Sequence, residues 1–598
     1  MTQLALHLAE AVSDYLAEPS RADVRNLIPL SAPFDVVNER LRHLTGIRRF
    51  FPDAVALAEF ERVLQSPQEG NRAQARQWGD FQTPPRLAAQ VCGCLADLDL
   101  SPDIVVEPTY GVGNFITAAL RAFPQARLVY GVEIQDKYEW QFKIALLEQA
   151  LHGRRPTAEL DLHQDDIFTH KFSPEVLNAQ NILILGNPPW VTNAALRVLD
   201  SGNLPVKSNI KALTGLDART GKSNFDLGEY ILLRLLALFA AQRGTLALLC
   251  KSSVIKSLVE MLPRWRLPVS NIRAYGIDAA REFGAAVEAS LLVIDLGQPH
   301  PTFLCTVASL DNPQQAAHTF GWVRNKFVSH IDDYRTISAL DGESLFVWRQ
   351  GLKHDCAKIM EMDVAGEVLV NGNGDVVDVE DRWVYWLLKS SDLKGIELDQ
   401  ARKKVLVTQQ HIGEDTTALR ILAPRLWQYL EKHRRFLDTR KSSIYQGKPP
   451  FSIFGIGPYS FKPYKVAVSG LYKELRFVVV RPIDNQPVML DDTCYFLGFD
   501  TYLDALLTAS LLNSLPTRQF LRSIVFEEAK RPYTKEILMR INLVAVANQV
   551  DWQELHTAWD AAGYRPRTLV LESDFEDYKR RVLQPNNAKA SVQLSLGL

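Results

Sequence analysis

The chain has 598 residues, of which 47% are hydrophobic and 23% charged, and these values exclude a chain that is disordered as a whole. Its length predicts two or three domains, each with its own core. The 67 Lys and Arg nearly balance the 69 Asp and Glu, so attraction to a polyanion must come from a local patch.

Cysteine usage and the N-terminus indicate where the protein works. Six cysteines in so long a chain do not form a disulfide framework, and Cys92 and Cys94 lack a second pair or a His at zinc spacing. We therefore expect reduced thiols and no metal site. The N-terminus carries Glu10 and Asp14 where a signal peptide would be apolar, and the apolar run 230–241 is shorter than a membrane span. These features favour a soluble, cytoplasmic protein.

Residues 1–75 have helical patterns and are predicted to form a helical N-terminal extension. Over residues 76–300, short apolar runs alternate with helix-length segments, which is typical of buried parallel strands in a doubly wound sheet. The fold class predicted for this region is α/β and Rossmann-like. The expected strands are 103–108, 126–133, 181–186, 245–251 and 289–296.

After residue 300 the pattern changes to irregularly joined, strand-like segments rich in aromatic residues, Gly and Pro. This favours an α+β domain over residues 301–570. Residues 571–598 are expected to form a C-terminal tail. The strand-like segments are 344–350, 403–409, 451–457, 464–470 and 476–482.

The residues that follow each expected strand are the first candidates for a site, because ligands of open parallel sheets bind beyond the carboxyl ends of the strands. Gly111 and Gly113 form a turn after the first strand, where glycine lets the backbone approach a ligand closely. Glu133 ends the second strand, where doubly wound folds hydrogen-bond a ribose diol. The segment 165–168, Asp-Asp-Ile-Phe, can accept from an adenine amino group and pack against its ring. Singly these acids fit a strand end or a helix cap; their order favours a nucleoside site.

The most specific pattern is Asn187-Pro188-Pro189-Trp190, directly after the strand 181–186. Two consecutive prolines hold the backbone extended and remove two donors, so carbonyls and the Asn187 amide face outward from a rigid strand end. The aromatic ring follows at once. The alternative is a rigid loop with a packed Trp, but the position directly after a strand of this sheet favours a functional site.

These motifs, preceded by Phe81-Gln82-Thr83-Pro84-Pro85, together resemble the gamma class of DNA amino-methyltransferases of restriction-modification systems. The resemblance extends from about residue 78 to 296, and the aromatic-rich remainder resembles the target recognition domains of that class. It implies a Type II-like, site-specific enzyme that transfers a methyl group from S-adenosylmethionine to N6 of a flipped-out adenine, protecting host DNA. It also implies duplex DNA as a partner and allows a separately encoded endonuclease; we expect a monomer, associated with the nucleoid through DNA.

By that resemblance, Thr83 and the backbone at the glycine turn hold the methionine part of the cofactor, with Glu107 near its amino group. Glu133 takes the ribose hydroxyls, and the acidic segment 165–167 takes the adenine, where Asp165 and Asp166 both fit the motif. The expected cofactor-binding residues are Thr83, Glu107, Gly111, Gly113, Glu133, Asp165, Asp166, Ile167 and Tyr230.

The chemistry explains the catalytic corner. An exocyclic base amine is a poor nucleophile, and its protons need acceptors as the nitrogen becomes tetrahedral; the Asn187 side-chain oxygen and the Pro188 carbonyl can supply two. The base must also leave the stack, and aromatic side chains recover part of that cost. The resemblance makes Trp190 one such ring and Phe283 a second. The expected catalytic residues are Asn187, Pro188, Pro189, Trp190 and Phe283.

Substrate contacts are expected in the second half of the chain. Between residues 431 and 473, nine basic residues stand against two acids, with aromatic residues interleaved, and such density matches phosphate contacts. A second basic patch is 349–354. The alternative is a solvated charged face over an aromatic core. The expected DNA-binding residues are Lys353, Arg440, Lys441, Lys448, Lys462 and Lys465.

Three other functions remain open. N4 of cytosine presents a similar amine to a similar pocket. A protein-glutamine methyltransferase also uses an Asn-Pro-Pro-aromatic corner, although such enzymes are much shorter. A DNA specificity subunit with an inert catalytic fold is the third. No nuclease carboxylate cluster is found, so a fused nuclease is not expected.

Overall fold

The computed structural model describes five stretches of the chain, which are residues 3–65, 82–190, 226–472, 474–527 and 531–583. The chain divides into two compact units, Met1–Phe327 and Val328–Leu598, called the first and second unit below. Within the described stretches, no helix combines the length and the apolar character that a membrane span requires. The six cysteines are free thiols.

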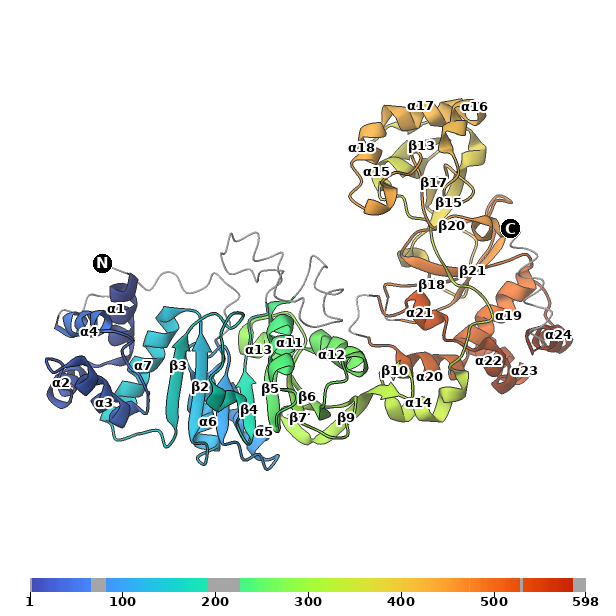
Figure 1. Ribbon diagram of the computed structural model, residues 1–598. Coiled ribbons are helices and arrows are strands. Elements are labelled where there is room, and N and C mark those ends of the chain that lie inside the picture. Colours follow the sequence, from blue (N-terminus) through green and yellow to red (C-terminus); the bar gives the residue numbers. More distant parts are fainter. Residues whose placement is uncertain (1–2, 66–81, 191–225, 473, 528–530, 584–598) are drawn as a thin grey trace. The chain divides into compact units, whose positions relative to one another are not determined.

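A sheet of ten described strands forms the centre of the first unit, in the order β10-β9-β8-β6-β7-β5-β4-β1-β2-β3 (Figure 1). Strands β1 to β5 pair in parallel, whereas β7 runs antiparallel to both β5 and β6. The strands are β1 (Ile104–Glu107), β2 (Leu128–Glu133), β3 (Glu159–Gln164), β4 (Ile182–Gly186), β5 (Gly244–Lys251), β6 (Ser270–Ile277), β7 (Ala289–Leu296), β8 (Leu304–Ser309), β9 (Asn312–Val323) and β10 (Lys326–Val328).

All five apolar runs expected to be strands are strands, namely β1, β2, β4, β5 and β7, so the α/β prediction is confirmed. The parallel direction expected for 289–296 is wrong, because β7 pairs antiparallel with β5. Strands β3 and β6 were not predicted. Only one residue of β3 is fully buried, which is why its sequence lacks the continuous apolar run of a central strand.

Helices connect and cover these strands. One core joins residues of the sheet to residues of the N-terminal helices, so the predicted extension is helical but belongs to the first unit. The helices are α1 (Gln3–Tyr15), α2 (Glu18–Leu27), α3 (Phe34–Thr45), α4 (Ala54–Gln65), α5 (Pro85–Ala96), α6 (Asn114–Ala122), α7 (Asp136–Leu151), α8 (Pro174–Leu177), α11 (Leu227–Phe239), α12 (Ser252–Trp265) and α13 (Ala279–Phe283).

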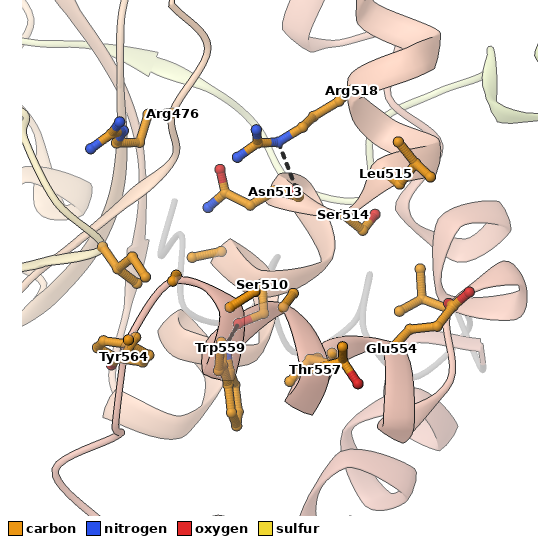
Figure 2. A pocket seen from close by; sticks show the side chains of 18 of the residues that line it. Arg476, Ser510, Asn513, Ser514, Leu515, Arg518, Glu554, Thr557, Trp559 and Tyr564 are labelled. Carbon is orange, nitrogen blue, oxygen red and sulfur yellow. Dashed lines mark hydrogen bonds between the residues drawn. The ribbon is translucent and has the colours of Figure 1, made fainter.

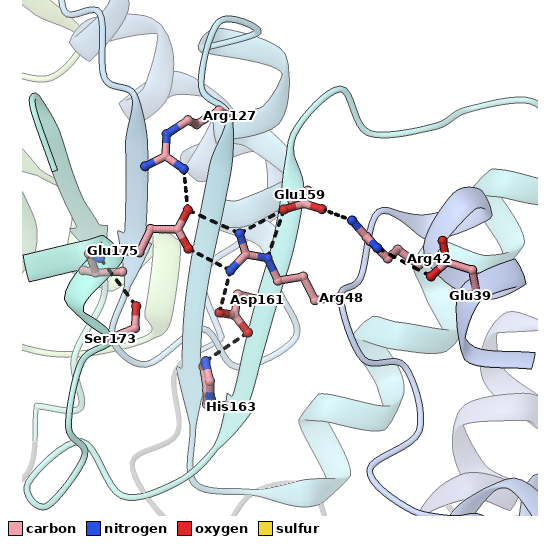
Figure 3. Close-up of polar contacts among 10 residues, drawn as sticks. Glu39, Arg42, Arg48, Arg127, Glu159, Asp161, His163, Ser173 and Glu175 are labelled. Atoms are coloured by element: carbon pink, nitrogen blue, oxygen red, sulfur yellow. Dashed lines mark hydrogen bonds and ion pairs between the residues drawn. The ribbon is translucent and has the colours of Figure 1, made fainter. Parts of the chain in front are cut away.

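Arg48 joins the N-terminal segment to the edge strand β3 (Figure 3). Its guanidinium lies 2.9 Å from Glu159, 3.3 Å from Asp161 and 2.9 Å from Glu175. The hydrogen bond from Arg48, with a second from Arg127, lowers the pKa of Glu175 to about 2. The neighbouring backbone forms a bridge to the same strand. The N-terminal segment therefore covers an edge that would otherwise be open to pairing with another chain.

The strand order reverses at β1, which lies between β2 and β4. In doubly wound sheets a reversal of this kind opens a crevice at the carboxyl ends of two neighbouring strands, which here are β1 and β4. Glu107 ends β1 and Asn187 directly follows β4, so both residues lie at this point. The topology thus brings together the motifs expected to bind the cofactor and to carry the reaction.

The second unit contains two smaller sheets, ordered β11-β21-β18-β19-β16 and β14-β13-β12-β17-β15-β20, with helices between the strands. This confirms the α+β prediction, although 451–457 forms no strand. The strands are β11 (Arg349–Gln350), β12 (Glu361–Ala365), β13 (Val368–Asn371), β14 (Val376–Val377), β15 (Val384–Leu388), β16 (Glu397–Leu398), β17 (Lys403–Leu406), β18 (Tyr464–Ser469), β19 (Val478–Val480), β20 (Met489–Leu490) and β21 (Cys494–Phe499). The helices are α14 (Ile331–Ile337), α15 (Ala357–Met360), α16 (Leu419–Leu422), α17 (Pro424–Lys432), α18 (Arg434–Asp438), α19 (Tyr502–Asn513), α20 (Leu515–Ile524), α21 (Lys535–Leu538), α22 (Leu543–Gln549), α23 (Trp552–Ala561) and α24 (Glu572–Leu583).

Two boundaries differ from those expected. The large sheet continues past residue 300 through β8 and β9, so the first unit extends to Phe327. The predicted tail begins with helix α24, which buries Phe575, Tyr578 and Val582, because its apolar residues recur at helical spacing. A tail was therefore the wrong prediction for 572–583, and residues 584–598 lie outside the described stretches.

Candidate functional site

The turn after β1 requires glycine at two positions. Gly111 has φ +51° and Gly113 has φ +76°, a region that other residues rarely adopt. A Cβ on Gly113 would lie 2.2 Å from the Phe142 ring, and one on Gly111 would lie 2.3 Å from Gln82 Oε1. The turn therefore brings backbone, rather than side chains, to the crevice beyond β1.

Glu133 holds this turn from the end of β2. Its Oε2 accepts a hydrogen bond from the Gly111 N–H at 2.8 Å, and its Oε1 accepts one from the Gln135 N–H at 2.9 Å. The residue is 7% exposed. A carboxylate that is buried and bonded to backbone donors is fixed in position. The two expected cofactor motifs, the glycine turn and Glu133, are therefore joined by a hydrogen bond.

Three polar atoms beside the turn lack partners. Glu107 Oε2, Thr109 Oγ1 and Tyr110 Oη are shielded from solvent and have no hydrogen bond within the described part of the chain. Burial, together with the nearby Glu133, raises the pKa of Glu107 well above its ordinary value. A buried polar atom left unbonded costs about 1–3 kcal/mol, so a ligand with matching groups would be stabilised here. The Glu107 carboxyl matches the ammonium group of S-adenosylmethionine in charge and hydrogen bonding.

The two candidate aspartates after β3 differ in their contacts. Asp165 accepts a hydrogen bond from His170 Nδ1 at 2.8 Å, and His170 Nε2 lies 2.8 Å from Tyr130 Oη. Burial is the largest influence on the pKa of Asp165 and raises it, but the bond from His170, the backbone N–H of Asp166 and the nearby imidazoles together outweigh burial, so the net shift is downward. Asp166 Oδ1 instead accepts the Phe168 N–H at 2.9 Å. Asp165 is thus committed to an internal network, and Asp166 is the better candidate for a ligand contact.

Apolar residues line the neighbourhood of Asp166. Ile167 is 6% exposed and Tyr230, near the start of α11, is 8% exposed. The Tyr230 and Phe168 rings lie 5.0 Å apart. The structure therefore brings Tyr230, which was expected to contact the cofactor, close to the acidic segment, and supplies an apolar surface beside a carboxylate.

The catalytic corner is linked to the glycine turn through Thr83. Asn187 Nδ2 donates to Thr83 Oγ1 at 3.2 Å, while Asn114 Nδ2 donates to the Thr83 carbonyl at 2.8 Å. Asn114 is the first residue of α6, directly after Gly113. One residue thus contacts both the Asn187 carboxamide and the helix that begins at the turn, so the two motifs are adjacent in space.

The aromatic residues of the corner are also brought together. Trp190 is 7% exposed, and its Nε1 donates to the Leu249 carbonyl on β5 at 3.3 Å. The Trp190 and Phe283 rings meet edge to face, with centroids 5.1 Å apart. Pro188 is buried and Pro189 is half-buried. Phe283, singled out from spacing before β7, therefore lies against the predicted catalytic motif.

The six expected DNA-binding residues of the second unit differ in their exposure and contacts. The prediction that Lys465 contacts a phosphate is wrong: Lys465 is 1% exposed and donates to the Lys462 carbonyl, and burial lowers its pKa to about 7. Its position in β18 turns the side chain inward, which a basic-residue count cannot detect. Lys441 and Lys448 are exposed, as a phosphate contact requires.

Three further basic residues are engaged within the unit. Lys462 pairs with Asp500 at 2.7 Å and Lys353 with Asp355 at 2.7 Å. The Arg440 guanidinium lies 3.7 Å from the centre of the Tyr445 ring and donates to backbone carbonyls. These contacts favour a structural role for Arg440, whereas the two lysines remain partly exposed at their ion pairs.

The second unit also holds a pocket of about 1070 Å³ between α19, α20 and α23 (Figure 2). Two pairs of its polar groups are bonded to each other: Trp559 Nε1 donates to Ser510 Oγ at 3.0 Å, and Arg518 Nε donates to the Asn513 carbonyl at 2.8 Å.

Sequence reasoning gave no role to several residues of the site. Gln82 was named only as part of a motif; its Oε1 accepts the Val112 N–H at 3.0 Å and so supports the glycine turn. Asn114 and His170 were not singled out, because neither has a spacing signal. Lys251 could have been found, since it ends β5 and strand ends were already the criterion.

Comparison with known proteins finds a relative that matches most of the chain. No protein-family model matches the chain. The chain is 40% identical over 478 residues to the Type II methyltransferase M.NspV of Nostoc sp. (strain ATCC 29411 / PCC 7524), covering 79% of this chain and 98% of the relative.

Among solved structures, the Type IIL restriction-modification enzyme MmeI in complex with DNA has a TM-score of 0.45 at 12% identity, covering 86% of this chain and 73% of MmeI. The type IIG restriction endonuclease BpuSI has a TM-score of 0.33 at 13% identity, covering 93% of this chain and 69% of BpuSI. Because both scores are low, the sequence relative is the informative comparison.

Proposed function

The chain belongs to the Type II methyltransferases of restriction-modification systems, which transfer a methyl group from S-adenosylmethionine to DNA, and we propose that the acceptor is N6 of an adenine rotated out of the duplex. The link from Asn187 through Thr83 to Asn114 supports transfer to an exocyclic base amine, because it puts an amide acceptor beside the glycine turn. The order of the motifs along the chain supports it further. The choice of adenine rests on the resemblance of the motif 187–190 to the adenine-specific members of the class.

The cradle around the glycine turn fits the cofactor, which when bound supplies a methyl group activated by its sulfonium charge. Glu107 would bind the ammonium group and so relieve the cost of its own burial. Glu133, held by two backbone N–H groups, would present its carboxylate to the ribose. Asp166 with Ile167 would take the adenine ring, since Asp165 is bonded to His170.

The residues of the corner would act as acceptors. As the target nitrogen becomes tetrahedral, the Asn187 side-chain oxygen and the Pro188 carbonyl accept its two N–H groups. Thr83 Oγ1 accepts from the Asn187 amide nitrogen and so restrains the carboxamide. Acceptors fixed before the reaction need no reorganisation in the transition state, which is the usual source of their effect. No covalent enzyme nucleophile is required.

Aromatic contacts would hold the extruded base. Leaving the stack costs a few kcal/mol, and the paired rings of Trp190 and Phe283 offer an apolar surface next to Asn187. Lys441 and Lys448 would contact phosphates, and a separately encoded endonuclease would be the partner in restriction. The enzyme would act as a monomer, because one catalytic and one recognition unit can read an asymmetric target.

Nucleoside analysis tests this function. Purified protein is incubated with the cofactor and unmodified duplex DNA, and the digested nucleosides are identified by mass. N6-methyladenine is the expected product. N4-methylcytosine without N6-methyladenine would contradict the choice of base, and unmodified DNA would favour the inert specificity subunit.

A further inference from the structure

Lys251, the last residue of β5, contacts two residues that are far apart in the sequence. Its Nζ donates to the Trp190 carbonyl at 3.2 Å and to Asp226 Oδ2 at 2.5 Å. The side chains of Lys251 and Asp226 are only 20% and 11% exposed. An ion pair so shielded from water has a defined geometry, unlike an exposed pair.

Each partner of Lys251 belongs to a different part of the site, and Trp190 belongs to the catalytic corner. Trp190 is already held by its indole, whose Nε1 donates to Leu249 on the same strand. The Lys251 contact adds its carbonyl, so the last residue of the Asn-Pro-Pro-Trp corner is attached to β5 at both its side chain and its backbone. Both contacts attach the corner to the central sheet.

The other partner, Asp226, precedes helix α11. Its Oδ1 caps α11 by accepting the N–H groups of Gly228 and Glu229 at 2.9 and 3.3 Å. A Cβ on Gly228 would lie 3.2 Å from the Pro189 carbonyl, so the start of α11 packs directly on the catalytic corner. The same helix carries Tyr230, which contacts Phe168 in the segment expected to hold adenine.

We propose that Lys251 is a positioning residue for methyl transfer, one that fixes the catalytic corner relative to helix α11. This inference rests on the proposed function, and it goes beyond it by adding a residue that touches neither cofactor nor base. The ammonium group supplies both contacts at once, so a neutral side chain of similar length would lose both. A guanidinium would keep the charge and its donors.

The substitution Lys251→Met tests the proposal. A misplacement of about 1 Å can cost about 100-fold in rate, so we expect single-turnover transfer to fall by about that factor while the Kd values for cofactor and duplex change by less than about threefold. Lys251→Arg should recover at least about tenfold of the loss. Asp226→Asn keeps an oxygen for the helix cap and removes the charge; combined with Lys251→Met it should cost little more than either change alone. Lys171→Met, at an exposed lysine of the same unit, is the matched control.

A second readout does not depend on activity. The indole ¹H–¹⁵N resonance of Trp190, assigned with Trp190→Phe, should shift in Lys251→Met and stay in place in Lys171→Met. An unshifted resonance with an unchanged transfer rate would overturn the proposal, and so would a lower melting temperature with a normal transfer rate. If wild-type protein transfers no methyl group to DNA, the proposed function fails, while the indole shift still decides whether Lys251 holds the corner.

Discussion

Replacing Glu133 by Gln perturbs one group that supports both the turn and the cofactor site. In the native protein its two oxygens accept the Gly111 and Gln135 N–H groups at 2.8 and 2.9 Å. Gln keeps the shape but offers one acceptor, so its NH₂ group must face a buried N–H. One charge-assisted bond, about 1.5–3 kcal/mol, is lost, and the other becomes a neutral bond, about 1 kcal/mol weaker. We expect the free energy of unfolding of the first unit to fall by about 2.5–4 kcal/mol.

The assay pairs denaturant unfolding with calorimetric titration of S-adenosylmethionine. We expect the cofactor Kd to rise at least about tenfold, which corresponds to about 1.4 kcal/mol, with the base preference unchanged. Glu288→Gln, at an exposed glutamate of the same unit, should alter neither quantity. If Glu133→Gln bound the cofactor as tightly as wild type and unfolded at the same denaturant concentration, the role given to Glu133 would be refuted.

Three further changes test other parts of the account. Gly113→Ala places a Cβ 2.2 Å from a neighbouring ring at φ +76° and should weaken cofactor binding at least tenfold by calorimetry; Gly93→Ala, where a Cβ meets nothing within 4 Å, should stabilise its helix by up to about 1 kcal/mol. Arg48→Met should lower the free energy of unfolding by about 1–3 kcal/mol at pH 7. That loss should shrink as the pH falls from 4.5 towards 2, because carboxylates with lowered pKa contribute stability above their ordinary pKa and lose it as they protonate; an equal loss at pH 3 would count against the ion pairs. Replacing both Lys441 and Lys448 by Gln should reduce the slope of log affinity against log salt by about 2 in gel-shift titrations, and an unchanged slope would exclude them from the interface.

The sequence predicted the parts of the fold that depend on continuous apolar runs. Strands β1, β2, β4 and β5 are buried along nearly their whole length, so their pattern is unambiguous. The direction of β7 could not be predicted, because an apolar run has the same pattern in a parallel as in an antiparallel pair. The prediction of a tail was wrong for a different reason. Phe575, Tyr578 and Val582 do recur at helical spacing, but a helix as short as α24 depends on packing for its stability, so the pattern alone was not decisive.

Part of the site could also be predicted from the sequence. Glu107, Glu133 and Asn187 were identified by their positions at strand ends, which the topology brings to one crevice. What the sequence could not supply was the network between them: that Thr83 bonds both Asn187 and Asn114 depends on tertiary packing. Burial decides in the same way at Lys465, a basic residue whose side chain points into the second unit.

The most direct test of the central claim compares methyl transfer by wild type and Asn187→Ala, from labelled S-adenosylmethionine to duplex DNA, at saturating cofactor. Loss of one preorganised hydrogen-bonding group costs about 100- to 1000-fold in rate, and we expect a fall of that size with cofactor Kd and DNA affinity within about twofold of wild type. The exposed Asn178→Ala is the control and should transfer normally. Undiminished transfer by Asn187→Ala would contradict the account, and loss of cofactor binding together with transfer would show that Asn187 supports the fold instead.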